Sequence, residues 1–110
     1  MDYGFSNKLP KNDKRLKRYA RQRKKRGFDD TETWNLYVTI TNFIVPRLKR
    51  FRKTTISHPP NLTMEEWKDI LKQMTRGFEE VLKSDEEDCD HEKTMLALEL
   101  FSKWYFHLWS

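Results

Sequence analysis

The stretch that decides the fold is LTMEEWKDILKQMTRGFEEVL, residues Leu62–Leu82. Its large apolar side chains recur at intervals of three and four residues, which places them on one face of an α-helix. They are Trp67, Ile70, Leu71, Met74, Phe78, Val81 and Leu82. A helix with a single apolar face is stable in water only against a partner. The sequence therefore predicts a helix over residues 64–83 that packs against the rest of the chain.

The beginning of this helix is predicted as well. Thr63 and Glu66 have the spacing of a capping box, in which the hydroxyl accepts a hydrogen bond from the Glu66 N–H and the carboxylate accepts one from the Thr63 N–H. Pro59 and Pro60 lie upstream and keep an earlier helix from running into this one.

A second helix is predicted over residues 31–53. The apolar residues with helical spacing are Leu36, Ile40, Phe43, Ile44, Leu48 and Phe51. The segment Trp34–Val45 is also rich in β-branched and aromatic residues, so a strand is an alternative. We favour the helix, because the spacing fits a period of 3.6 better than strict alternation. Pro46 lies inside the pattern and is expected to kink or break the helix.

A third helix is predicted over residues 91–109, the most apolar part of the chain. Its apolar side chains surround nearly the whole helix, which is typical of a buried or shared helix. Two partner helices leave part of this surface uncovered, and large exposed apolar patches mark interaction sites. We therefore expect an interface at Trp104, Tyr105, Phe106 and Trp109. The alternative is that the apolar residues of the N-terminal segment fold over it.

Charge is unevenly distributed along the 110 residues. Residues 1–26 hold eleven Lys and Arg against two Asp, whereas the remainder has a net charge of −4. We expect a basic N-terminal arm over 1–27, partly helical or flexible, followed by a helical domain over 28–110. The arm is either a phosphate-binding element, which we favour, or a solubilising tail or surface helix. The predicted fold class is thus all-α, a small three-helix bundle with a kinked first helix and a basic N-terminal arm or helix.

The sequence has no motif of an enzyme, a cofactor site or a metal site. It lacks a nucleophile elbow, a phosphate-cradling glycine loop and a zinc-ligand pattern. The acidic segment 84–92 lacks the spacing of a calcium loop and is expected to be a solvated loop that caps the next helix. The single cysteine, Cys89, excludes an internal disulfide and suits a reducing cytoplasm. We therefore expect neither catalysis nor a cofactor.

Four pieces of the chain resemble one family: WNL at 34–36, PRLKRF at 46–51, EEW at 65–67 and FHLW at 106–109. Together they are similar to small uncharacterised proteins encoded by tailed phages and prophages, over roughly residues 26–110. The resemblance implies a phage accessory protein in the host bacterial cytoplasm. It implies no particular activity.

Two functions remain open from the sequence. The first is non-enzymatic binding of an anionic ligand, a nucleic acid or a nucleotide, with sequestration of a host-defence signal as one version. The residues expected to bind it are Arg21, Arg23, Arg26, Arg47, Lys49 and Arg50. The second is a protein-interaction module that inhibits a host protein through its aromatic C-terminal helix. In either case we expect a homodimer and no membrane partner.

Overall fold

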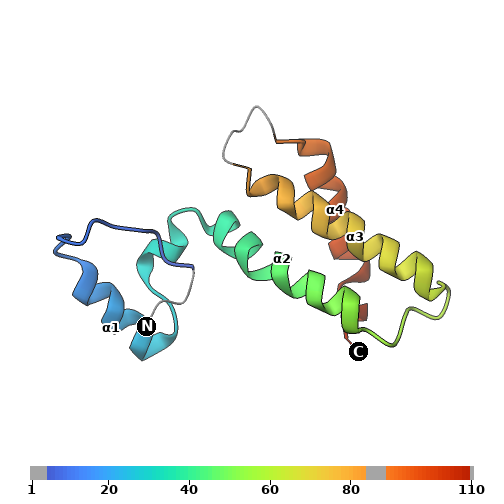
Figure 1. The fold of residues 1–110 in the computed structure, drawn as a ribbon, viewed down its shortest axis with the longest axis horizontal. Coiled ribbons are helices and arrows are strands. Elements are labelled where there is room, and N and C mark those ends of the chain that lie inside the picture. Colours follow the sequence, from blue (N-terminus) through green and yellow to red (C-terminus); the bar gives the residue numbers. More distant parts are fainter. Residues whose placement is uncertain (1–4, 84–88, 110) are drawn as a thin grey trace. The chain divides into compact units, whose positions relative to one another are not determined.

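The computed structural model describes residues 5–83 and 89–109. The described residues form four α-helices and two short 3-10 helices, with no strand among them (Figure 1). The α-helices are α1 (Leu16–Arg26), α2 (Leu36–Thr54), α3 (Met64–Val81) and α4 (His91–Trp104), and the 3-10 helices are η1 (Asp30–Thr33) and η3 (Tyr105–His107). The all-α class is confirmed. The described residues contain four α-helices rather than three, because the last part of the basic arm, Leu16–Arg26, forms α1.

The chain divides into two compact units, residues 1–42 and 43–110, and the division falls inside α2. We call them the N-terminal unit and the C-terminal unit. The division lies further along the chain than the boundary predicted after residue 27.

The C-terminal unit is built around α3. Its capping box is present, with Thr63 Oγ1 accepting from the Glu66 N–H at 3.1 Å and the Glu66 carboxylate accepting from the Thr63 N–H at 2.9 Å. The predicted apolar face supplies half of the buried core. That core consists of Val45 and Leu48 from α2, Trp67, Leu71, Met74 and Phe78 from α3, and Ala97 and Trp104 from α4.

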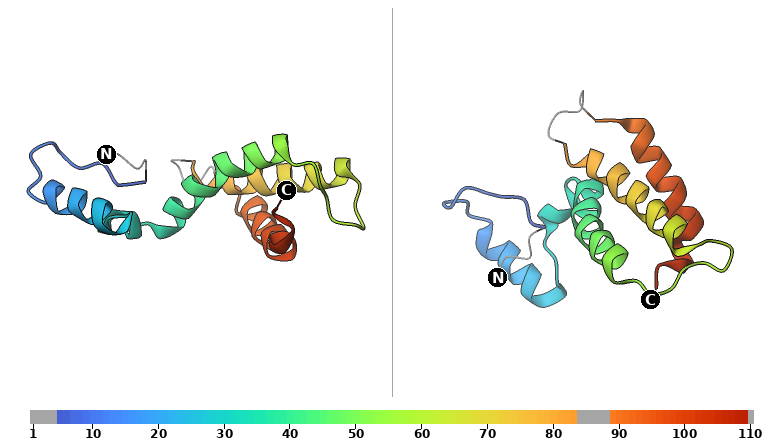
Figure 2. Two further views of the ribbon diagram at one scale, coloured as in Figure 1. Left: turned by 90° about the horizontal axis from the view of Figure 1, so that it is seen from below. Right: turned by 45° about the vertical axis from the view of Figure 1, so that its right-hand side comes forward.

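Helices α3 and α4 lie side by side (Figures 1 and 2) and approach closely at Gly77. The Thr94 hydroxyl of α4 donates to the Gly77 carbonyl at 3.0 Å. A Cβ atom at residue 77 would overlap the Lys93 carbonyl oxygen and the Ala97 Cβ. Glycine is therefore required here by the distance between the helices rather than by its backbone angles.

The N-terminal unit packs α1 against η1. Tyr19 is the buried residue of α1 and meets the Trp34 ring edge to face, with centroids 6.1 Å apart. Gly27 ends α1 with a φ of 87°, a left-handed conformation that favours glycine. A second capping box, between Asp29 and Glu32, begins η1.

Three details of the predicted helices are corrected. The second helix begins at Leu36 instead of residue 31, because residues 30–33 form the tighter η1 turn. The strand alternative is wrong, since Leu36–Thr54 is helical throughout. The last helix ends at Trp104 and continues only as η3.

Pro46 does not break α2, which continues on both sides of it. Proline has no N–H to donate and its ring crowds the preceding turn. Here the Arg47 guanidinium donates to the Phe43 carbonyl at 2.8 Å and lies over the Phe43 ring, 3.8 Å from its centroid. The Arg47 side chain thus donates a hydrogen bond to the Phe43 carbonyl, which belongs to the helical turn before Pro46.

None of the helices in the described part of the chain has the length and apolar character needed to cross a membrane.

We expect Gly77→Ala to destabilise the protein by about 1–3 kcal/mol, because the added methyl group forces α3 and α4 apart. In an open helix the same change would stabilise by about 1 kcal/mol. Chemical denaturation measures the difference, with Gln73→Ala on the exposed face of α3 as the control. A Gly77→Ala protein as stable as the wild type would contradict the close helix contact.

Candidate anion-binding site

A cleft of about 300 Å³ lies between the second half of α2 and α3, within the C-terminal unit. Five of the side chains that line it are cationic and only one is acidic. The lining residues are Lys49, Arg52, Lys53, Lys72, Thr75, Arg76 and Glu79. We call this cleft the cationic groove.

The helical repeat explains why these cations meet. On α2, Lys49, Arg52 and Lys53 are spaced three and four residues apart, so they share one side of the helix. On α3, Lys72 and Arg76 are four residues apart and share a side in the same way. The packing of the apolar faces of α2 and α3 brings the two cationic edges together.

Two contacts hold the groove in place. The Arg52 Nε donates to the Lys68 carbonyl at 3.0 Å, which ties α2 to α3. Lys49 Nζ pairs with the Glu79 carboxylate at 3.3 Å, with both side chains about half exposed. An ion pair this exposed contributes little to stability. It does set one end of the groove, where the only lining carboxylate neutralises one cation.

The remaining cations of the groove have their charges available. No carboxylate of the described residues lies within ion-pair distance of Lys53, Lys72 or Arg76. The Thr75 hydroxyl donates to the Leu71 carbonyl of its own helix at 2.8 Å. Positive charges that lie close together in a cleft with walls of low dielectric constant raise the local electrostatic potential. A positive potential attracts anions.

The cationic lining continues along α3 on both sides of the groove. Lys68, one turn before Lys72, lines a neighbouring cleft that also contains Glu65 and Asp69. Arg76 also lines a third cleft, of about 230 Å³, together with Lys93 of α4. The net charge of the lining residues is +4 in the cationic groove, +1 in the first of these clefts and +2 in the other.

The residues predicted on α2 are only partly in this groove. Lys49 lines it, whereas Arg50 is exposed outside it. Arg47 is exposed and is engaged with Phe43 of its own helix. Four lining cations are not among the residues predicted to bind the ligand: Arg52, Lys53, Lys72 and Arg76. The four-residue spacing of Lys68, Lys72 and Arg76 was a usable signal for a basic edge on α3.

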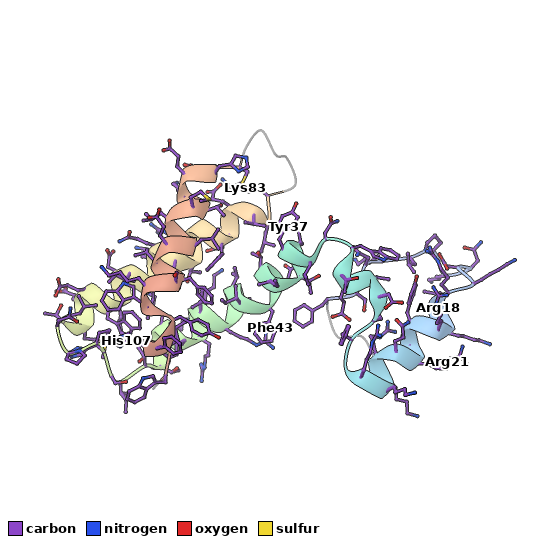
Figure 3. All side chains as sticks on the ribbon, turned by 180° about the vertical axis from the view of Figure 1, so that it is seen from behind. Arg18, Arg21, Tyr37, Phe43, Lys83 and His107 are labelled. Atoms are coloured by element: carbon purple, nitrogen blue, oxygen red, sulfur yellow. The ribbon has the colours of Figure 1, made fainter. Side chains whose placement is uncertain are left out.

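The predicted cations of the N-terminal unit lie on α1. Arg23 reaches the buried Asp29 carboxylate at 2.5 Å, and Arg26 pairs with Asp30 at 2.6 Å. Arg21 is exposed, with no ion-pair partner among the described residues (Figure 3). The α1 cations in the same exposed state are Lys17, Arg18, Arg21, Lys24 and Lys25, and Lys14 in the turn before α1 is exposed as well. Two of the three predicted arm residues are therefore engaged in holding α1.

Asp29 is the centre of this arrangement. Its side chain is fully buried and accepts hydrogen bonds from Ser6, Thr31 and Arg23. Burial alone would raise the pKa of the Asp29 carboxyl group, but these three donors outweigh it and hold the pKa below its ordinary value. The carboxylate therefore remains charged and fixes Arg23.

The predicted aromatic interface separates into buried and exposed parts. Trp104 is only 8% exposed and packs edge to face on Trp67, so it belongs to the core. Tyr105, Phe106 and Trp109 are 53%, 86% and 67% exposed. We call these three the aromatic end. The Ser57 hydroxyl donates to the Trp109 carbonyl at 3.4 Å, which places the aromatic end beside the segment after α2.

No group of metal-binding side chains occurs among the described residues. The acidic segment 84–92 is described only from residue 89 onward, so the rest of that prediction lies outside the described residues. Asp90 caps α4 by accepting from the Lys93 N–H at 3.2 Å.

No protein-family model, curated protein or solved structure matches this chain. The resemblance to phage proteins stays a prediction.

We expect Asp29→Asn to lower the free energy of opening of α1 by about 3 kcal/mol, because it removes the buried negative charge to which Ser6, Thr31 and Arg23 donate. Hydrogen exchange of the α1 amides measures this opening directly. The matched control is Asp30→Asn, which breaks an exposed pair and should cost less than about 1 kcal/mol. Equal effects of the two changes would contradict the central role of Asp29.

The same measurement has a predicted pH dependence. The native pKa of Asp29 is lowered, so its stabilising contribution is complete above the pKa of the unfolded chain. It is lost as the pH falls through the lower native pKa. Protection of the α1 amides should therefore fall on acidification in the wild type, and fall less in Asp29→Asn.

Proposed function

We propose that this protein is a non-enzymatic binder of phosphate-bearing anions, with the cationic groove as its principal site. The observation that carries the proposal is the meeting of cations from two helices, five against one carboxylate. Phosphate groups are ligands that Arg and Lys side chains bind through charge-assisted hydrogen bonds. Nucleic acids and nucleotides are the biological molecules that present such groups.

Binding suits the groove better than catalysis. The lining side chains offer positive charge, and the one hydroxyl among them, that of Thr75, already donates to its own helix. Such a surface holds charge but presents no nucleophile next to a general base. If the resemblance to phage proteins holds, sequestration of a host-defence signal is one use of this binding.

The test compares two double variants that lose the same charge. Lys72→Ala/Arg76→Ala removes cations from the groove, and Arg50→Ala/Lys103→Ala removes two exposed cations that do not line it. Fluorescence anisotropy with a labelled oligonucleotide measures affinity at several salt concentrations. We expect the groove variant to bind more weakly at low salt and to reduce the slope of log affinity against log salt by about 1–2.

The charge-matched variant should retain most of the affinity, and thermal unfolding should show both variants folded. Equal losses in the two variants would mean that net charge alone, and no particular site, is responsible. Absence of binding by the wild type at low salt would overturn the proposed function.

A second function, protein–protein interaction, is favoured by the exposure of the aromatic end. Phe106 and Trp109 are large apolar side chains whose exposure to water is unfavourable. Aromatic side chains of this kind often anchor protein interfaces. We propose that the aromatic end forms a homodimer contact or docks on a host protein.

We expect Phe106→Ser/Trp109→Ser to convert a dimer into a monomer without loss of folding, because both side chains are exposed. Light scattering after size-exclusion chromatography measures the mass. The contrasting variant is Trp104→Ala, which should destabilise the core by about 3–5 kcal/mol. A wild type that is monomeric, or a double variant that remains dimeric, would contradict a dimer at this surface.

A further inference from the structure

We infer that the ligand of the cationic groove is a phosphodiester chain held by its backbone, without recognition of its bases. This inference rests on the proposed function and narrows it from any phosphate-bearing anion to a polymer. Three features of the structure support it: the chemistry of the lining, the extent of the cations along α3, and a second cationic surface on α1.

The lining of the groove has no aromatic side chain on which a nucleic-acid base could stack. None of its seven residues is aromatic, and none carries a large apolar side chain. Nucleotide and single-strand sites hold bases by stacking them on aromatic side chains. An Arg plane can also stack on a base. Arg52, however, is turned to the Lys68 carbonyl, which leaves only Arg76 for that role.

The size of the groove leads to the same conclusion. Pockets that enclose a small ligand have volumes of roughly 300–1,000 Å³ and are mostly apolar. The cationic groove, at about 300 Å³, is at the lower end, and six of its seven lining residues are charged. We expect phosphate and sugar groups to occupy it, with the attached base outside in water.

The row of cations along α3 is longer than a single phosphate group. Lys68, Lys72 and Arg76 follow one another at four-residue steps along α3, and each step advances about 6 Å. Arg52 and Lys53 face this row from α2. A mononucleotide places its charge at one end of the row, whereas a chain with one charge per nucleotide meets it along its length.

Exposed cations on α1 provide a second, separate contact for a polymer. Five of them have no ion-pair partner among the described residues: Lys17, Arg18, Arg21, Lys24 and Lys25. A chain long enough to contact the groove and α1 together gains affinity, because the second contact becomes intramolecular. A short chain gains nothing from it. Affinity should therefore rise with ligand length.

The experiment is a series of ligands that differ in length and base. Labelled single strands of about 4, 16 and 40 nucleotides cover the site sizes of small binding domains. They are made as all-T and all-A chains, and AMP, ATP and inorganic polyphosphate serve as competitors. We expect at least about a tenfold gain in affinity from the shortest to the longest chain. All-T and all-A chains of equal length should differ by less than about threefold, and polyphosphate should compete.

Two variants separate the two contacts. Lys72→Ala/Arg76→Ala should weaken binding of all chain lengths. Arg21→Ala/Lys24→Ala/Lys25→Ala should weaken binding of the longest chain and leave the shortest unchanged, because a chain of about four nucleotides has no phosphates left over for a second contact. Equal loss for short and long chains in the α1 variant would overturn the second contact.

The failure of this inference is distinguishable from failure of the proposed function. If AMP or ATP binds as tightly as the longest strand, or if the base changes affinity more than about tenfold, backbone binding of a polymer is wrong and anion binding stands. If neither the nucleotides nor the strands bind at low salt, both proposals are overturned.

Discussion

Burial of the apolar face of α3 is the constraint on which the C-terminal unit depends. Trp67, Leu71 and Met74 are fully buried, and this fixes the rotation of α3 about its own axis. Every other side chain of the helix then has its place determined by the 3.6-residue repeat. Lys72 and Arg76 lie at the edge of the buried face, so the packing that stabilises the fold also brings them to the cations of α2. The cationic groove is thus formed by the same packing that forms the core, and no additional interaction is needed to position its cations.

Features encoded within one segment were predictable from the sequence. The capping box at Thr63 and the apolar spacing predicted the beginning of α3 at its observed residue and its end within two residues. The groove could not be predicted in this way, because it depends on which edge of α2 meets which edge of α3. Arg50 and Arg52 are equivalent by composition, and only the packing directs Arg52 into the groove. The tight η1 turn also escaped prediction, because its residues suit the first turn of an α-helix equally well.

The cations of α1 fall into two groups in the structure, those that form ion pairs within the N-terminal unit and those that are exposed to solvent. Arg23 and Arg26 are committed to Asp29 and Asp30, which follow α1 directly, and they hold the N-terminal unit together. Most other cations of α1 are exposed. A count of charges cannot distinguish these groups, because both kinds of residue occur in one basic run. The distinction arises from geometry: a four-residue step brings Arg26 next to Asp30, and the turn at Gly27 returns the chain toward α1.

The size of the unit argues for binding by charge rather than by enclosure. A pocket that encloses a nucleotide needs apolar walls, and such walls would be taken from a core of only eight buried side chains. Phosphate binding by surface Lys and Arg makes no such demand, because much of its free energy comes from the release of counterions from the ligand. The cost is a mutual repulsion of the cations, which solvation and screening by salt reduce. A small helical bundle can therefore bind a polyanion without weakening its own core, and we propose the Lys- and Arg-lined groove between α2 and α3 as a site of that kind.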